Sequence, residues 1–393
     1  MNTDLARLRP YPFERLRDLL AGTTPPAGVA PINLAMGEPR HPPADSIITA
    51  FDQLESDLAH YPATIGSAAL RSSCARYLER RFDLGGIDPQ SMVLPLNGTR
   101  EGLFAVAQAL IDRKQQASVM LPNPFYQIYE GAALLAGAEP DYLAVDESGQ
   151  IDIDAVSRER WQRCQLLYLC SPHNPTGAVL GQQALERLVK LAQRYDFTIV
   201  ADECYSDIYT GAPPPGLLAA CDALGIDRFR HCLVFHSLSK RASVPGLRSG
   251  FVAGDPQLIG AFRLYRSYHG CAMPPAHQRA SIVAWDDDRY ARENRQRYTE
   301  KFAAVLAILR SRLGIETPAG GFYLWLPIGT DDEDFARRLY AEHALTVLPG
   351  RYLGRRANGH NPGAGHIRVA LVAPLPDCIE AAKRIDSLLE NTL

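Results

Sequence analysis

Blocks of apolar and mixed residues alternate regularly through the middle of the chain. Short apolar runs at residues 92–96, 119–121, 166–170, 197–201 and 233–235 are separated by longer segments with helical periodicity, such as 184–192. Near-continuous apolar strands that are joined by helices are typical of a mostly parallel sheet with both faces covered. The pattern therefore predicts an α/β fold built around such a sheet.

The pattern changes near Ala284, where longer helical segments begin to alternate with fewer strand-like runs. This second pattern predicts a smaller α+β unit. A joint rich in Pro and Gly at residues 22–28 separates a short amphipathic arm from the rest of the chain. We expect an N-terminal arm with part of the small domain at residues 1–43, a large domain at 44–284 and a small C-terminal domain at 285–393.

Composition and charge exclude several classes of protein. The 393 residues are 46% hydrophobic and 22% charged, with a net charge of −3 and no basic block, so nucleic acid is not an expected partner. No apolar stretch is long enough to span a membrane, and the first ten residues lack the apolar core of a secretory signal. The eight cysteines show no CxxC or zinc-ligand spacing, which suits reduced thiols. We expect a cytoplasmic protein without a metal site.

Unusual polar residues follow all five apolar runs. Ligands of open α/β sheets bind outside the carboxyl ends of the strands, so these clusters should meet at one edge. The most informative cluster contains Lys240 among small residues. A lysine that attacks a carbonyl needs a partly desolvated pocket near other cations, and this environment fits Lys240 better than the other lysines, for which we expect solvated positions. Taken alone, Lys240 could equally be an ordinary loop lysine.

The other clusters each have two interpretations. Gly98, Thr99 and Arg100 open a helical segment and could hold a phosphate, although Thr99 could simply cap the helix. Asp202 ends a buried run and needs a cationic partner, either a protonated ring nitrogen or a core arginine. Further polar and aromatic residues could hold a flat ring or its substituents, or could be ordinary turn, core or rim residues: Tyr126, Asn174 and Tyr205.

Together these residues supply a lysine, a phosphate cup completed by Ser237 and Arg248, an acid and an aromatic ring, which are the groups that pyridoxal phosphate requires. The chain resembles the class I/II pyridoxal-phosphate aminotransferases of fold type I in the segments SPHNPTG, ADECYSD and SLSKRASVPGLRSG. The resemblance runs along nearly the whole chain. It implies a large domain with a mostly parallel, seven-stranded sheet between helices, and a smaller α+β domain.

The resemblance also implies roles for individual residues. Lys240 would form the Schiff base with pyridoxal 5′-phosphate and move a proton between substrate and cofactor. Asp202 would keep the ring nitrogen protonated, and Tyr126 would stack on the ring. Asn174 and Tyr205 would bond to the phenolic oxygen. The phosphate would be held by Gly98, Thr99, Arg100, Ser237 and Arg248.

Three further residues concern the substrate and the partner subunit. Arg368 would bind the substrate α-carboxylate, for which a guanidinium is well suited. Gly37 would close over the substrate, where Asn174 also lies. Tyr61 would reach the phosphate of a neighbouring subunit, so the resemblance implies a homodimer with shared active sites.

A narrower resemblance concerns the substrate. The segments LRPYPFERLRDLLAG, NPFYQIYEGAALLAGAEP and FARRLYAEHALTVLPG, among others, resemble succinyldiaminopimelate aminotransferases of bacterial lysine biosynthesis. Such a substrate carries extra carboxylates, for which spare cationic or donor groups are Arg263, Arg266, His269 and Arg351, each of which could instead be a surface charge. Arg351 also stands where we expect a small hydroxyl residue.

Other functions on the same scaffold stay open. The first is another class I aminotransferase that uses alanine, an aromatic amino acid, acetylornithine or unsuccinylated diaminopimelate. The second is a β-eliminating C–S lyase. The third is a non-catalytic regulator, which is disfavoured because no DNA-binding segment precedes the arm and both Lys240 and Arg368 are present.

Overall fold

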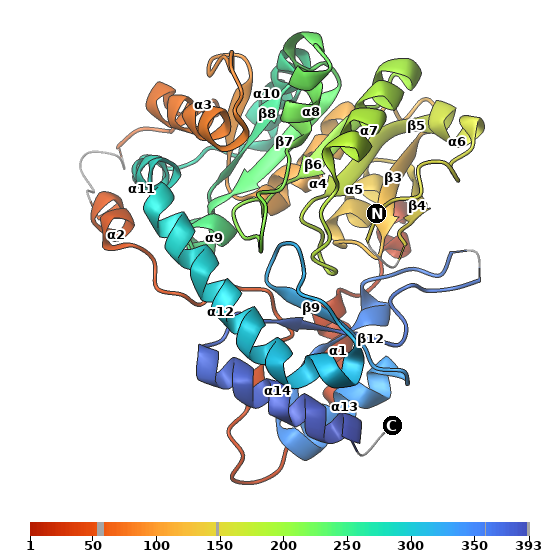
Figure 1. Cartoon of the computed structure of the whole chain (residues 1–393). Helices are drawn as coiled ribbons and strands as arrows, with labels where there is room; N and C mark the ends of the chain where they lie inside the picture. Colours follow the sequence, from red (N-terminus) through yellow and green to blue (C-terminus); the bar gives the residue numbers. More distant parts are fainter. Residues whose placement is uncertain (53–58, 147–148, 358, 391–393) are drawn as a thin grey trace.

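The computed structural model describes residues 1–52, 59–146, 149–357 and 359–390, and its largest element is a seven-stranded sheet (Figure 1). The strand order is β2-β8-β7-β6-β5-β3-β4, and the pairs are parallel except those that involve β8. The prediction of a mostly parallel α/β sheet is confirmed. The strands are β2 (Val93–Leu96), β3 (Ser118–Asn123), β4 (Glu139–Ala144), β5 (Cys164–Cys170), β6 (Thr198–Asp202), β7 (Cys232–Ser237) and β8 (Gly250–Gly254).

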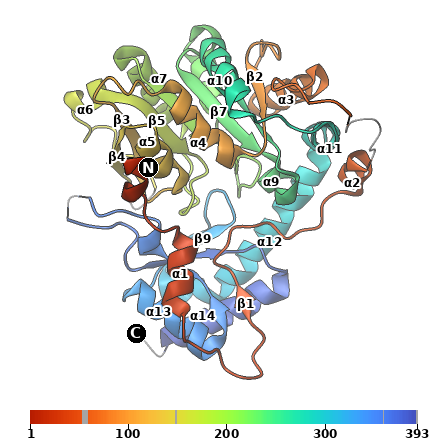
Figure 2. The same cartoon turned by 180° about the vertical axis from the view of Figure 1, so that it is seen from behind.

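Both faces of this sheet are buried. Along β5, Leu166 and Tyr168 belong to one hydrophobic core, whereas Leu167 and Leu169 belong to the other. Successive side chains of a strand point to opposite faces, so a strand that is covered on both sides must be apolar throughout. One face packs against α4 (Thr99–Leu110), α5 (Ile128–Leu135) and α10 (Pro256–His269), and the other against α3 (Ala68–Phe82), α6 (Arg158–Arg163), α7 (Gln182–Tyr195), α8 (Leu217–Ala223) and α11 (Pro275–Asp286) (Figures 1 and 2).

A smaller unit combines the C-terminal residues with the N-terminal arm. Its antiparallel sheet has the order β11-β12-β9, and β1 pairs with β10 in a separate parallel sheet. Ile32 from the arm therefore shares a core with Leu326 and Ile385. The elements are α1 (Pro12–Leu20), β1 (Ile32–Asn33), β9 (Tyr323–Pro327), α13 (Asp332–His343), β10 (Leu345–Thr346), β11 (Leu348–Pro349), β12 (His366–Ala370) and α14 (Leu375–Glu390).

The long helix α12 (Asp288–Leu313) joins the two units, and the short helix α2 (Asp45–Phe51) packs beside α11. Tyr290, near the start of α12, belongs to a core of the large sheet, whereas Phe302 and Leu309 belong to the core of the small unit. Figure 1 shows α12 running from α11 down to α14. One rigid helix therefore has side chains in both units. Among the described helices, none combines the length and the apolar character that a membrane span needs.

Candidate active site

The carboxyl ends of the predicted strands meet at one edge of the large sheet, as the sequence led us to expect. β2 and β7 both run antiparallel to β8, so β2 has the same direction as the parallel strands. Loops of the small unit reach this edge, where the backbone N–H of Gly320 donates to Gly177 and that of Gly321 donates to Ile208. The polar clusters at the strand ends therefore face residues of the small unit.

Lys240 lies just beyond the carboxyl end of β7, in the short helix α9 (Leu238–Arg241). Its Nζ donates to the carbonyl oxygen of Gly37 at 2.8 Å and lies 5.3 Å from the ring centre of Phe322. The pKa of Lys240 is lowered to about 8, mainly by burial and also by Arg368 and Arg100, against the opposing influence of Cys204 and Asp202. About a tenth of the amine is therefore neutral at pH 7, and a nucleophilic lysine acts through this neutral form.

Asp202 ends β6, and its side chain is buried. Its carboxylate accepts hydrogen bonds from the hydroxyl of Tyr129 at 2.8 Å and from the backbone N–H of Cys204 at 3.2 Å. Burial raises the pKa of Asp202, against its hydrogen bonds and the nearby charge of Lys240, and within the described ranges it forms no ion pair with Lys or Arg. The alternative interpretation, a core arginine paired with Asp202, therefore does not hold among the described residues. A buried carboxylate without an ion-pair partner is suited to an added cation such as a protonated ring nitrogen.

The predicted phosphate cup lies at the N-terminus of α4. Gly98 has φ of +86°, and a Cβ there would lie 2.3 Å from Nη2 of Arg248, so the glycine permits the close approach of that guanidinium. Free backbone N–H groups at a helix N-terminus and a nearby arginine favour an anion. Thr99 and Ser237 are buried beside the cup, with Thr99 Oγ1 3.1 Å from Sγ of Cys204 and Ser237 Oγ accepting from the N–H of Ser239 at 3.1 Å.

Arg100 and Tyr126 pair with each other at the outer side of the cup. Nε of Arg100 donates to the hydroxyl of Tyr126 at 2.7 Å. This contact brings together two residues that the sequence assigned to different parts of the site, the phosphate and the ring. Their bond orients the tyrosine from the strand end after β3 toward the first turn of α4.

Arg368 lies on β12, on the opposite side of the site. Its guanidinium donates to Oδ1 of Asn174 and to the carbonyl of Ala35, both at 2.8 Å, and its ring contact is Tyr323, with 4.4 Å from Cζ to the ring centre. Nε of Arg368 is buried without a hydrogen-bond partner among the described residues. A buried donor that has no partner is costly, so this guanidinium is suited to an incoming acceptor such as a carboxylate.

Two tyrosines complete this side. The hydroxyls of Tyr205 and Tyr323 lie 3.0 Å apart. A Cβ on Gly37 would lie 2.0 Å from the hydroxyl oxygen of Tyr323, so the glycine is required by close packing. Of the predicted residues, only Tyr61 lies away from these contacts, because its side chain is completely exposed.

Sequence reasoning missed Tyr129, Cys204 and Tyr323. Tyr129 lies within α5, where a buried aromatic reads as an ordinary core residue, and its partner Asp202 is 73 positions away. Cys204 lies in the segment ADECYSD, which was singled out for its neighbours, and Tyr323 lies in the apolar run GGFYLWL. The only available signal was their position in those segments.

Two of the spare cations proposed for extra substrate carboxylates are already paired. Arg266 is buried, and its Nη1 donates to both carboxylate oxygens of Glu101, at 2.8 and 2.7 Å. Arg351 forms ion pairs with Asp331, Asp332 and Glu333 at the start of α13. Because their charges are neutralised by these carboxylates, the interpretation of both arginines as free substrate ligands is wrong for this structure. Arg263 is exposed.

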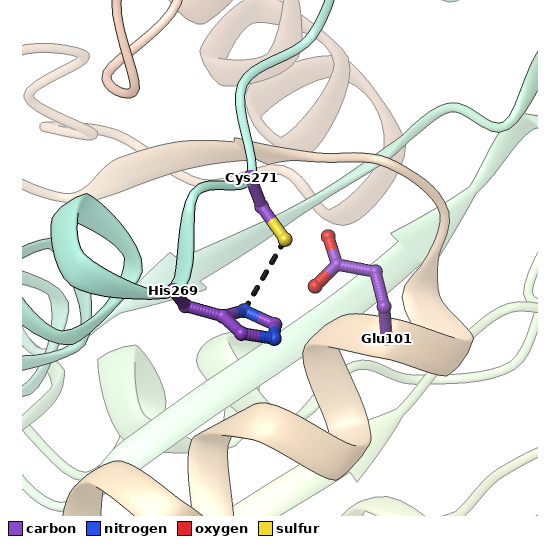
Figure 3. A group of neighbouring side chains, drawn as sticks. All are labelled: Glu101, His269 and Cys271. Carbon is purple, nitrogen blue, oxygen red and sulfur yellow. Dashed lines mark hydrogen bonds between the residues drawn. The ribbon is translucent and has the colours of Figure 1, made fainter.

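His269 lies at the end of α10 beside Cys271, with 3.2 Å between Nδ1 and Sγ, and both face Glu101 (Figure 3). These three side chains form a group of metal-ligand type. However, Glu101 also accepts the backbone N–H of Asn97 at 2.9 Å in addition to its two bonds from Arg266. Its carboxylate therefore serves to connect α10 with the first turn of α4, beneath the phosphate cup.

The assembled residues fit pyridoxal phosphate on the evidence of their own contacts. Among the described residues, a buried acid has no ion-pair partner and a buried arginine donor has no acceptor, and a glycine leaves space for an arginine at a helix N-terminus. These features match a protonated ring, a substrate carboxylate and a phosphate, in that order. The nearby lysine is the group that the aldehyde requires.

Comparison with known proteins agrees with this chemistry. The family described as aminotransferase class I and II matches residues 29–385. The crystal structure of an aminotransferase from Neisseria meningitidis is 44% identical, with a TM-score of 0.95 over 99% of this chain and 100% of that one. An LL-diaminopimelate aminotransferase from Nitratidesulfovibrio vulgaris is 31% identical over 98% of both chains. A probable N-succinyldiaminopimelate aminotransferase from Thermus thermophilus is 28% identical, with a TM-score of 0.85 over 96% of this chain and 99% of that one. The chain therefore belongs to the class I and II aminotransferases and is a pyridoxal-phosphate-dependent enzyme of this family.

Proposed function

We propose that the enzyme transfers an amino group between N-succinyl-L,L-diaminopimelate and 2-oxoglutarate in bacterial lysine biosynthesis. The products are N-succinyl-2-amino-6-oxopimelate and glutamate. The observation that carries the amino-acid part of this proposal is the buried guanidinium of Arg368 with its unpartnered Nε, close enough to Lys240 to lower the pKa of its amine. The likeness to the Thermus thermophilus protein supports the succinylated substrate.

The protein's own groups divide the work of the reaction. Pyridoxal phosphate, when bound, supplies the aldehyde and the electron sink. Arg368 binds the substrate α-carboxylate and so fixes which bond of the α-carbon faces Lys240. The amine of Lys240, neutral in part at neutral pH, accepts the α-proton and returns it on the other side of the transfer. Gly37, whose carbonyl oxygen accepts from the lysine amine, would close over this position.

The remaining groups would hold the cofactor in place. Asp202 would receive the ring nitrogen and keep a proton on it, because a buried carboxylate is stabilised by a cation. Tyr126 would stack on the ring, and Asn174 and Tyr205 would bond to the phenolic oxygen. The phosphate would be held by Gly98, Thr99, Arg100, Ser237 and Arg248.

A second candidate substrate is unsuccinylated L,L-diaminopimelate, because the relative from Nitratidesulfovibrio vulgaris is an LL-diaminopimelate aminotransferase. The two substrates differ at the end that is distant from the reaction. Succinylation removes a cationic amine and adds a carboxylate, so the site must provide cations or amide donors for one substrate and acceptors for the other. A direct comparison of the two compounds therefore tests the assignment.

We also propose a cytoplasmic homodimer with shared active sites. The side chain of Tyr61 is completely exposed in a single chain, which suits a residue that reaches the phosphate of a partner. Sedimentation of the purified protein tests the dimer. Tyr61→Phe should weaken retention of the cofactor in the dimer, and a monomeric enzyme with full activity would contradict the proposal.

The test of the substrate is the visible absorbance of the loaded enzyme. Glutamate should remove the absorbance band of the lysine-bound cofactor, and N-succinyl-2-amino-6-oxopimelate should restore it far faster than pyruvate, an aromatic 2-oxo acid or unsuccinylated 2-amino-6-oxopimelate. Equal recovery with the unsuccinylated compound would favour the second candidate. A band that never responds to glutamate would refute this donor.

A further inference from the structure

Three polar residues form a connected cluster where α12 passes the segment that comes after Gly37. Nζ of Lys301 lies 2.7 Å from Nε2 of His41, and Nδ1 of His41 lies 2.7 Å from Oδ1 of Asn294. Asn294 and Lys301 are buried, and His41 is half-buried. The position of Lys301 contradicts the sequence-based expectation of a solvated face. None of the three has a place in the site described above.

The ends of the cluster fix the direction of every hydrogen bond within it. Nδ2 of Asn294 donates to the carbonyl oxygens of Lys240 at 3.0 Å and Arg241 at 3.3 Å, which cannot donate in return. Oδ1 of Asn294 must therefore accept from Nδ1–H of His41, and Nε2 of His41 must accept from Lys301. Burial lowers the pKa of His41 to about 4, which is consistent with a neutral ring that has one donor and one acceptor.

The cluster touches three elements that carry active-site residues. Asn294 bonds to the backbone of Lys240 itself. His41 lies four residues after Gly37, whose carbonyl accepts from the lysine amine. Lys301 also donates to the carbonyl of Leu371 at 3.1 Å, three residues after Arg368. A single face of α12 therefore connects the lysine, the segment over the substrate and the strand of the carboxylate-binding arginine.

Burial of an ammonium group is costly, so specific contacts must stabilise Lys301 in its buried position. Within the described ranges it forms no ion pair with a carboxylate, and burial lowers its pKa to about 8. The charged and titratable groups around it are His41, Cys378, Arg297 and Arg40, and the ring of Tyr298 lies 5.2 Å away. Two arginines nearby make the site less favourable still for a cation.

We propose that His41, Asn294 and Lys301 are positioning residues for amino transfer, which set the relative positions of Lys240, the Gly37 segment and the Arg368 strand. Asn294 and Lys301 act through hydrogen bonds to backbone groups, and His41 connects the two side chains. Misplacement of reacting groups by about 1 Å is enough to lower a rate about 100-fold. Loss of the cluster should therefore reduce the rate of the half-reaction more than the affinity for the cofactor, because Gly98, Thr99 and Arg100 of the phosphate cup lie at the N-terminus of α4.

The sharpest test compares two substitutions of half-buried His41 in the loaded enzyme. In His41→Gln the side-chain amide can still donate to Asn294 while its oxygen accepts from Lys301. In His41→Phe the ring fills the space but can do neither. Stopped-flow loss of the visible band with saturating glutamate should be slowed on the order of 10- to 100-fold in His41→Phe and within about threefold of the parent in His41→Gln. Equal rates in these two variants would overturn the proposal.

A mutant cycle tests whether the cluster acts as one unit. Asn294→Leu and Lys301→Met should each slow the same step, and the double variant should be no slower than the slower single variant. Losses that multiply, or a lower Tm with an unchanged rate, would overturn the proposal. Should either variant fail to fold, the His41 pair still decides. Arg160→Met, which removes an ion pair with Asp141 on the outer strand β4, is the matched control and should leave the rate unchanged.

The readout is also independent of the proposed distal substrate. The half-reaction with glutamate involves only the amino donor, and the parent enzyme is measured first. If the parent does not respond to glutamate, the proposed donor fails before any variant is compared, and the same variants are then measured with the donor that does remove the band.

Discussion

The amine of Lys240 donates a hydrogen bond to the carbonyl oxygen of Gly37 across 2.8 Å, although the two residues are 203 positions apart in the chain. Lys240 comes after a strand of the large sheet, whereas Gly37 comes after β1 of the small unit. This bond therefore joins the two units at the lysine that we propose reacts with the cofactor. It also depends on a glycine, because Gly37 lies against the hydroxyl of Tyr323.

Gly37→Ala should impair both folding and catalysis. The new Cβ would lie 2.0 Å from the Tyr323 hydroxyl oxygen, so the backbone must move away from Lys240. We expect a loss of about 1–3 kcal/mol in the free energy of unfolding, as for other overpacked sites, and at least a tenfold lower kcat/KM. Gly85→Ala is the control, because no atom lies within 4 Å of its Cβ position. Parent-like kinetics of Gly37→Ala would contradict the assigned contact.

Asp202→Asn should not destabilise the cofactor-free protein, but it should impair catalysis by the loaded enzyme. The raised pKa of Asp202 means that the native cofactor-free state binds a proton more tightly than the unfolded state, so this group stabilises at low pH and its contribution is lost as pH rises above about 4. At pH 7 the substitution should therefore leave the Tm of the cofactor-free protein unchanged or higher. The loaded enzyme should lose at least about 100-fold in kcat, because an amide cannot hold a proton on the ring nitrogen.

Thermal unfolding of the protein with and without pyridoxal phosphate, from pH 4 to pH 8, checks the predicted effect on Tm. Asp154→Asn, at an exposed ion pair, should change the free energy of unfolding by no more than about 0.5 kcal/mol, with or without the cofactor. A large loss of Tm in the cofactor-free Asp202→Asn protein would show that the carboxylate is stabilised by its existing donors alone.

The sequence was sufficient for β2, β3, β5, β6 and β7, because their apolar runs are unbroken. It did not predict β4, where Glu139, Pro140 and Asp141 interrupt the run at the outer edge of the sheet, or β8, where Gly250 and Gly254 flank three apolar residues. Edge strands need only one neighbour, and glycine weakens the strand signal. Both strands are defined by their pairing with neighbouring strands, which the local sequence does not reveal.

Site residues at strand ends could also be predicted, because the topology of a parallel sheet brings Asp202 and Lys240 to one edge. Residues that reach the site by packing could not. Periodicity identified the helix of Lys301, but it cannot say which helical face a second unit will cover. The ion pairs of Arg266 and Arg351 could not be predicted, because their carboxylate partners are 165 and up to 20 positions away.

Arg368→Lys should weaken substrate binding much more than cofactor binding. The lysine keeps the charge but lacks the planar fork that can bond to both oxygens of a carboxylate while also reaching Asn174. Loss of one charged hydrogen bond is worth about 1.5–3 kcal/mol, so kcat/KM should fall about 10- to 150-fold, mainly through KM. Cofactor affinity, measured by fluorescence, should stay within about twofold. Arg312→Lys, at a surface ion pair with Asp386, is the control. An unchanged KM in Arg368→Lys would contradict its proposed role.

The lowered pKa of Lys240 predicts how the rate of cofactor capture depends on pH. Only the neutral amine attacks the aldehyde, so the rate at which the cofactor-free enzyme gains the visible band should rise with pH through about 8 and level off above it. Below this midpoint the rate should fall about tenfold per pH unit. A lysine with the ordinary pKa near 10.4 would show its midpoint more than two units higher.

Lys240→Arg should gain no band at any pH, because its guanidinium does not deprotonate, and should retain less than about one hundredth of the parent kcat. A midpoint near 10 in the parent enzyme would mean that the pocket around Lys240 is open to water, and would remove the basis for its action as a base at neutral pH.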